Sequence, residues 1–298
     1  MTSDILGVSI SGLRVSQNAL RTVGHNIANA NTAGYTRQST DINSMGGTQT
    51  GVGFLGNGSY TSNIERVVNE FVTAQVRQDT TLHSELTIYN QNISQLNDLL
   101  ANDSTGLSQG VQSFFSAVQT ASDSPTSLAS RQLLVSEASN LADRFNTLAA
   151  RVDAVNEGVV QGIRAGVSNV NNLTAEIASL NNKIAEFSGS QSASPNDLLD
   201  QRDNALLELS ALISVSVSVQ DGNQINVTVG NGIPLVLGSQ QTNIAVGQNE
   251  FDPQKPEILL VNNSISESIT SAFSGGEIGK YTSHSQSQQE HKTDVAQF

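Results

Sequence analysis

A run of about sixty residues without proline constrains this chain more than any other feature. From roughly Leu128 to Phe187, apolar side chains recur at steps of three and four, the spacing that gathers them on one face of a helix. At about 1.5 Å per residue, a helix of this length spans roughly 90 Å, which predicts a helical rod or coiled coil. The step lengthens near Gly158, Gly162 and Gly166, which predicts a stutter or a local bend.

Composition excludes several classes of function. The net charge of −13 argues against a nucleic-acid partner, because phosphate contacts need clustered Lys and Arg. The chain has no Cys, which excludes disulfides and thiolate metal sites. No apolar run reaches the ~18 residues of a membrane span, and the N-terminal residues lack the basic and apolar segments of a cleavable secretory signal.

A second apolar pattern occupies residues 4–29 and predicts an amphipathic helix. Leu6, Leu13, Leu20 and Ile27 recur every seven residues, and two further side chains broaden this stripe, Ile10 and Val23. The stripe has two interpretations: it packs within its own domain, or it packs against other subunits. The periodicity alone favours packing within the domain.

The remaining segments complete a mainly α fold class with a small antiparallel β module. Residues 31–61 are rich in Gly, Asn and Thr and predict an extended loop or short hairpin. A long helix is predicted from about Ser62 to Ala101, where Ile64 and Val68 begin an apolar spacing of three and four, and a turn is predicted at residues 102–110. From Ser214 the apolar period changes to two, which predicts short strands through about residue 262. The predicted division is an N-terminal helix with its loop at 1–61, a long helical bundle or rod at 62–212, a β module at 213–278 and a disordered tail at 279–298.

Candidate catalytic and binding motifs are weak. The sequence GVGFLG at residues 51–56 matches a dinucleotide-binding pattern, but neither a strand before it nor a helix after it is predicted. Asp197, Asp200 and Asp203 share one face of a predicted helix whose N-cap we assign to Asn196. The simpler interpretation is a negatively charged first turn with Arg202 as its counterion. We therefore expect no catalytic residue, no cofactor and no metal site.

Three segments resemble the flagellar axial proteins, the family of rod, hook and hook-associated subunits. NIANANTAGYTRQ resembles the family's N-terminal signature from Asn26 through Tyr35, with Ala33 where many members have Pro. GVGFLGNGSYTSNIERVVNEFVTAQVRQ is similar to the segment that follows. SPNDLLDQRDNALLELSALISVSVSVQDGNQINVTV resembles the hook-associated members of the FlgK type more narrowly.

The resemblance implies a structural adaptor at the junction between the flagellar hook and filament, without enzymatic activity. The implied partners are other copies of the chain in a homo-oligomeric ring, the hook protein, the next hook-associated junction protein and the flagellar export apparatus. The implied location is extracellular, after type III export without a cleavable signal peptide. The subunit-interface residues expected on this basis are Leu6, Ile10, Leu13, Leu20, Val23, Ile27, Asn26, Asn29, Asn31, Gly34, Tyr35 and Arg37.

Local chemistry agrees with a helix end inside the signature. Asn and Gly accept left-handed turns, so Asn29, Asn31 and Gly34 are expected to end the first helix sharply. Tyr35 and Arg37 then offer an apolar ring with a polar tip and a forked donor, which suit a wet interface between subunits.

The family pattern ends after about Gly279 in this sequence, where its members continue to a C-terminal helix that pairs with the N-terminal one. We therefore expect a truncation that removes the partner helix and the export-chaperone site. The chain alone would then assemble poorly or leave its first thirty residues disordered. Two alternatives stay open: a secreted coiled-coil effector or adhesin, and a hydrolase using the three aspartates.

Overall fold

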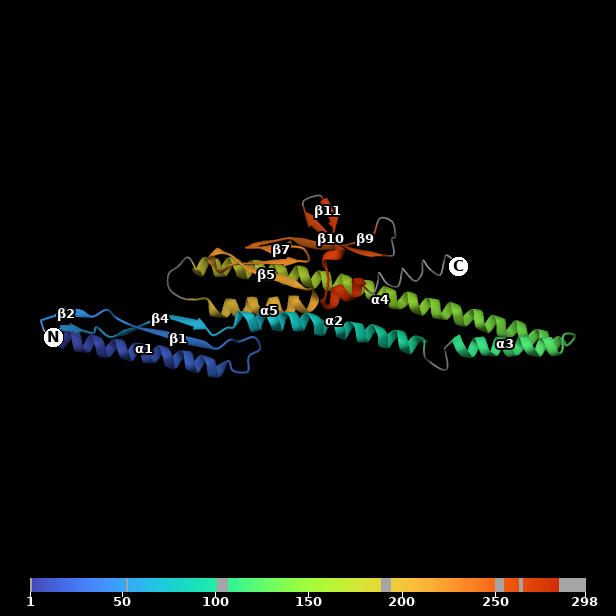
Figure 1. The fold of residues 1–298 in the computed structure, drawn as a ribbon, viewed down its shortest axis with the longest axis horizontal. Coiled ribbons are helices and arrows are strands. Elements are labelled where there is room, and N and C mark those ends of the chain that lie inside the picture. Colours follow the sequence, from blue (N-terminus) through green and yellow to red (C-terminus); the bar gives the residue numbers. More distant parts are fainter. Residues whose placement is uncertain are drawn as a thin grey trace.

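The computed structural model describes residues 2–51, 53–100, 107–188, 194–249, 255–262 and 265–283. The molecule is elongated, with an N-terminal unit at one end and a pair of helices at the other (Figure 1). One helix, α4 (Leu128–Ser188), runs through most of this length without interruption. The long helix predicted from Leu128 to Phe187 is therefore confirmed.

The N-terminal unit consists of α1 (Thr2–Ala28) packed on an antiparallel ribbon of β1 (Gln38–Ser44) and β4 (Ser59–Arg66). A small hairpin of β2 (Thr48–Thr50) and β3 (Gly53–Leu55) closes the far end of the ribbon. Because α1 is helical and packed, the expectation of a disordered N-terminus is wrong. The expectation of poor assembly is untested.

The second helix begins later than its apolar spacing predicts. The sequence places its start near Ser62, but residues 59–66 form β4, and α2 spans Glu70–Leu100. The backbone N–H groups of Phe71 and Val72 donate to Oδ1 of Asn69, at 3.1 and 3.3 Å, so Asn69 caps the helix. The predicted boundary at residue 61 therefore falls inside a strand, and the N-terminal unit extends through Arg66.

Two shorter helices flank α4. α3 (Leu107–Asp123) packs on the first part of α4, and α5 (Asn196–Leu212) lies between α4 and α2. Most of the turn predicted at residues 102–110 lies outside the described residues. Its last residues are helical, because α3 already starts at Leu107. Asn196 is the first residue of α5 rather than its N-cap, which is Pro195, and its side-chain amide donates to the Ile64 carbonyl at 2.8 Å.

Two antiparallel sheets cover the second half of α4. The first sheet has the order β5-β6-β7-β8 and the second has the order β11-β10-β9. Alternating residues bury one face of each sheet against α4 and α5, which forms the main core. The strands are β5 (Val215–Val219), β6 (Ile225–Val229), β7 (Ile233–Leu237), β8 (Gln240–Gln241), β9 (Asn243–Gln248), β10 (Pro256–Asn262) and β11 (Ile265–Ser268).

A buried polar hub joins α4, α5 and the first sheet. The amide of Asn181 donates to the carbonyls of Ile225 and Gly238, at 2.8 and 2.7 Å. Arg202 donates to Asn181 Oδ1 at 3.1 Å and to the Asn223 carbonyl at 2.6 Å, and burial lowers the pKa of its guanidinium. Arg202 therefore bonds neutral groups in this hub. The charge of Asp203 acts on it only as a smaller, opposing influence on its pKa, and the ion pairs with Asp200 and Asp203 that were expected of Arg202 are made by Arg66 instead.

The glycines of α4 allow a second helix to pack closely against it, and α4 continues through them as one helix. Residues 276–283 are helical and pack across α4, where a Cβ at Gly166 would lie 2.7 Å from Ile278 Cγ1 and one at Gly162 would lie 2.9 Å from Tyr281 Cζ. The expectation of disorder from residue 279 is thus wrong for residues 279–283. The rest of that predicted tail lies outside the described residues.

Candidate functional site: the N-terminal unit and its junction with α5

The apolar stripe of α1 faces outward. Leu13, Leu20 and Ile27 are 60%, 71% and 72% exposed. Burying this many aliphatic side chains against another surface is favourable by about 25 cal/mol per Å², so the stripe is a strong candidate interface. The stripe consists of Leu6, Ile10, Leu13, Leu20, Val23 and Ile27, and all six side chains are exposed.

The opposite side of α1 packs on the ribbon through small and polar side chains. Val15 and Thr22 are buried there. The Thr40 hydroxyl donates to Thr22 Oγ1 at 2.9 Å, and the Asn18 amide donates to Thr61 Oγ1 at 3.2 Å. The sequence analysis missed this face because Ser, Thr and Asn at helical spacing resemble a solvated surface.

The signature residue Asn26 ties the end of α1 to β1. Its Nδ2 donates to the Gln38 carbonyl at 2.8 Å, and its Oδ1 accepts from the Gln38 N–H at 2.9 Å. The Tyr35 hydroxyl also donates to Asn26 Oδ1, at 2.7 Å, and lies 3.0 Å from His25 Nδ1. Asn26 thus pairs with the strand as a backbone amide would, and fixes the direction in which the chain leaves the helix.

The rest of the signature forms the turn. α1 ends at Ala28, one residue before the predicted end at 29, and Asn29 Nδ2 donates back to the His25 carbonyl at 3.1 Å. Gly34 has a φ of +76°, and a side chain there would overlap the amide of Asn204 in α5. Asn31 and Arg37 are exposed. The structure therefore brings Asn26, Asn29, Gly34 and Tyr35 together as the scaffold of the turn.

A cluster of charged and polar groups, here called the junction cluster, joins the N-terminal unit to α5. It consists of Thr36, Arg66, Asp200 and Asp203. Nη1 of Arg66 donates to Asp200 Oδ1 at 2.7 Å and to Asp203 Oδ2 at 2.8 Å. Asp200 also accepts from the Thr36 N–H at 3.1 Å and from the Thr36 hydroxyl. Nearly all of the Asp200 side chain is buried, so these bonds replace its hydration.

The junction cluster accounts for two of the three aspartates that suggested a catalytic face. The third, Asp197, lies 3.5 Å from Gln38 Nε2 of β1. Sequence reasoning missed the real counterion, Arg66, because it lies 134 positions before Asp200 and was assigned to a helix. The sequence signal that could have identified it is Arg66 itself, a charged residue at the end of β4, the strand that pairs with β1 directly after the signature turn.

Tyr35 lies close enough to the aspartates of α5 for their negative charges to act on its hydroxyl. Desolvation, followed by the negative charges of Asp200 and Asp197, raises the pKa of the Tyr35 hydroxyl above its ordinary value of 10.0. The neutral phenol is therefore favoured, which suits its donation to Asn26.

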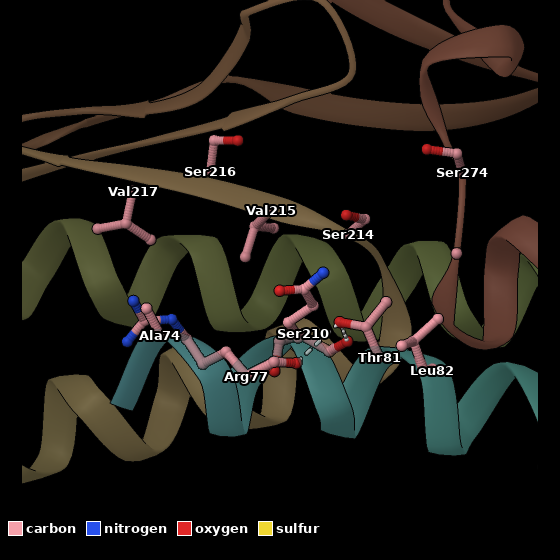
Figure 2. Close-up of a pocket in the computed structure, with 12 residues that line it drawn as sticks. Ala74, Arg77, Thr81, Leu82, Ser210, Ser214, Val215, Ser216, Val217 and Ser274 are labelled. Atoms are coloured by element: carbon pink, nitrogen blue, oxygen red, sulfur yellow. Dashed lines mark hydrogen bonds between the residues drawn. The ribbon is translucent and has the colours of Figure 1, made fainter. Parts of the chain in front are cut away.

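A pocket of about 470 Å³ lies elsewhere, between α2 and β5. Figure 2 shows Arg77 and Thr81 of α2 below it and Ser214 and Ser216 above it. The Thr81 hydroxyl bonds the Ser210 carbonyl at 2.6 Å, which joins α2 to α5. Among the described lining residues there is no carboxylate or imidazole to activate a serine, so the pocket lacks the geometry of nucleophilic catalysis.

Metal and membrane sites are also lacking in the described part of the chain. No group of three or more His, Cys, Asp or Glu side chains is arranged there to hold a metal ion. No described helix has both the length and the hydropathy needed to cross a membrane.

Comparison with known proteins identifies the family. Residues 93–295 match the family described as the helical domain of the flagellar hook-associated protein FlgK, and residues 6–36 match the flagella basal body rod protein family. The first match reaches residue 295, so the expectation that family resemblance ends near Gly279 is wrong. The second match covers most of α1 and the signature turn.

Individual relatives give the same assignment. The chain is 38% identical to flagellar hook-associated protein 1 of Salmonella typhimurium and 35% identical to that of Escherichia coli, in each case over 88% of this chain and 48% of the relative. It therefore spans about half the length of these curated relatives. A solved structure, the flagellar hook junction protein FlgK from Burkholderia pseudomallei, matches 70% of this chain and 38% of its own with a TM-score of 0.65 at 27% identity. The chain belongs to the FlgK-type family of flagellar hook-associated proteins.

Proposed function

We propose that this chain is a structural component of the bacterial flagellum at the junction between hook and filament, and that it acts by packing against other axial subunits. The observation that carries the proposal is the exposed apolar stripe of α1, on a helix whose other side is already packed. An apolar stripe that is exposed in one molecule can be buried when many copies pack side by side.

The junction cluster supports a mechanical part of this role. A force applied to α1 in an assembly passes through the β1–β4 ribbon to α5, which packs on both long helices. The bonds from Arg66 and Thr36 to Asp200 hold that connection in one orientation. We assign residues up to Arg66 to assembly, the long helices to a rigid rod, and the two sheets to a module on the outside of that rod.

Catalysis is not part of the proposal. The relatives are named flagellar hook-associated protein 1, and the aspartates considered for hydrolysis bond the N-terminal unit. The partners that fit the proposal are further copies of the chain, the hook protein, the next junction protein and the export apparatus. The location that fits is the outside of the cell, at the hook tip.

Incorporation at the hook tip tests the proposal. The chain would be supplied to cells that lack their own hook-associated protein 1, with and without the pair Leu13→Asp and Leu20→Asp. A matched control carries Arg14→Gln and Arg21→Gln, because both pairs lower the net charge by two and both alter exposed positions of α1. Antibody labelling of isolated hooks measures the bound chain.

We expect the unsubstituted chain and the arginine control to label hook tips and the aspartate pair to be absent. Equal labelling by all three chains would show that the apolar stripe is not the assembly surface. Absence of all three from hook tips would also count against the proposed role for this chain.

A further inference from the structure

The outer edge of β5 borders the pocket of about 470 Å³ that lies between this strand and α2. Four successive residues, 214–217, line the pocket. Because successive side chains of a strand point to opposite faces, a pocket lined by four in a row lies along the edge of the strand. Figure 2 shows Val215 and Val217 pointing from β5 toward α2, and Ser216 pointing away from it. We call this space between residues 214–217 and α2 the edge groove.

β5 presents a row of backbone groups to the edge groove. It is an outermost strand of its sheet and pairs with β6. The Gln220 N–H donates to the Gln224 carbonyl at 2.8 Å, so the pair that closes the turn is hydrogen-bonded. Bonded and non-bonded pairs alternate along an antiparallel ladder, so the odd-numbered residues of β5 direct their N–H and C=O groups away from β6. These residues are Val215, Val217 and Val219, and no other described element bonds their backbone.

The other edges of the sheets on α4 are closed or protected. At β9, the side-chain amide of Asn171 donates to the Ile244 carbonyl at 2.7 Å, and Asn171 Oδ1 accepts from the Ile244 N–H at 3.0 Å. β8 is only two residues long, and β11 carries the charged Glu267. Covers, short lengths and charges of this kind prevent an edge strand from pairing with another chain. β5 has five residues without a charge, a proline or a bulge, so its edge is able to accept a further strand.

Arg77 gives the edge groove a positive charge. Its side chain comes from α2, lines the groove and is half-buried. Within the part of the chain that the structure describes, its guanidinium makes no ion pair, and no carboxylate lines the groove. A partly desolvated guanidinium is stabilised by a carboxylate, which it binds through two parallel hydrogen bonds. The backbone edge therefore selects an extended chain, and Arg77 selects an acidic one.

We propose that the edge groove binds an extended acidic segment of a partner protein, which adds to β5 as a further strand. The outward N–H and C=O groups of β5 bond the backbone of this segment, and a carboxylate on its α2 side pairs with Arg77. A second copy of β5 is a poorer occupant, because it offers no carboxylate and brings a second Arg77. The edge groove shares no residue with the apolar stripe of α1, so this proposal and the proposed function are tested separately.

Amide exchange in the presence of short peptides tests the proposal. The probe is an end-capped peptide in which threonine alternates with valine, glutamate and valine, and the matched control has lysine in place of glutamate. NMR measures the exchange rate of each β5 amide in the full chain, with each peptide at millimolar concentration. The measurement is repeated for Arg77→Gln and for Arg131→Gln, which removes an exposed arginine of α4 outside the edge groove.

In the unsubstituted chain, we expect the glutamate peptide to slow exchange of the Val215 and Val217 amides about tenfold, because the added strand bonds them. The Ser216 amide, which faces β6, should keep its rate. The lysine peptide should have little effect on any of them. Arg77→Gln should abolish the difference between the two peptides, and Arg131→Gln should preserve it.

Four results would overturn the proposal. Unchanged exchange with the glutamate peptide would mean that the edge of β5 accepts no strand. Equal slowing by both peptides, or a preference for glutamate that survives Arg77→Gln, would mean that Arg77 does not select the occupant. Exchange that slows without peptide as the protein concentration rises would mean that a second copy occupies the groove.

Discussion

α1 and the second half of α4 carry similar apolar stripes, yet one stripe is exposed and the other is buried. On α4, the side chains of Ile163, Val170 and Ile177 are fully buried in the core that α4 shares with α5 and the sheets. On α1, all six side chains of the corresponding stripe are exposed, and small polar residues pack on the ribbon instead. An apolar period therefore predicts a helix and a face that seeks burial, but not whether the cover comes from the same molecule.

The two regions also use glycine differently. On α4, Gly162 and Gly166 let the helix at 276–283 approach closely. On α1, an added Cβ at Gly7, Gly12 or Gly24 would meet nothing within 4 Å. The α4 glycines are used for packing inside the molecule, whereas those of α1 have open space around them.

Truncating one leucine of α1 and one leucine of the core that buries the α4 stripe should give the largest contrast. Leu209 of α5 is fully buried against α4, so Leu209→Ala should lower the free energy of unfolding by about 2–5 kcal/mol. Leu20→Ala should change it by less than about 0.5 kcal/mol in the isolated chain. Urea denaturation followed by circular dichroism measures both. A large loss for Leu20→Ala would mean that the α1 stripe is already covered.

Breaking the connection between the regions should have the next largest effect. Arg66→Ala leaves the mostly buried Asp200 without its cation, at a cost of about 2–4 kcal/mol. Arg37→Ala, an exposed arginine on the same unit, should change stability by less than about 0.5 kcal/mol. Hydrogen exchange should show faster exchange in β1 and β4 for Arg66→Ala alone. Unchanged exchange there would refute the junction cluster as a structural link.

Replacing a glycine by alanine should change the stability of the chain in opposite directions in the two regions. Gly166→Ala places a methyl group against Ile278 and should destabilise the chain by about 1–3 kcal/mol. Gly24→Ala meets open space and should stabilise it by about 0.5–1 kcal/mol, because alanine is the better helix former. Thermal unfolding of the two variants gives the signs, and a shift in the same direction for both would contradict this distinction.

The smallest effect is expected at Tyr35. Tyr35→Phe removes the hydroxyl that donates to Asn26 and should cost about 0.5–1.5 kcal/mol. The pKa of Tyr35 is raised in the folded chain, so its contribution is complete below pH 10 and is lost as the pH rises above 10. Tyr281, whose pKa burial also raises, adds to the same loss. Stability measured from pH 8 to 11 should therefore fall less steeply for Tyr35→Phe, and an identical slope would contradict this linkage.

The sequence allowed the regular elements to be predicted better than their contacts. The bounds of α4 and the succession of short strands follow from local periods, which are properties of neighbouring residues. β4 was assigned to a helix because Ile64 and Val68 fit a spacing of four, and its pairing with β1 depends on residues 15 to 28 positions away, from Ser44–Ser59 to Gln38–Arg66.

The site shows the same limit. The signature turn could be predicted from Asn and Gly chemistry, and the apolar stripe from its period of seven. The pairing of Arg66 with Asp200 and the buried role of Arg202 could not, because each depends on which elements meet in space. The sequence alone did not decide whether the aspartates of α5 or its Arg202 would face the N-terminal unit.

Hydrogen exchange of the isolated chain tests the central claim most directly, since it compares the two stripes in one experiment. We predict that amides of α1 from Leu13 to Ile27 exchange at least about tenfold faster than those of α4 from Ile163 to Ile184, because only the α4 stripe is covered. Equal protection of the two helices would contradict the account, since it would mean that α1 already has its packing partner within a single chain.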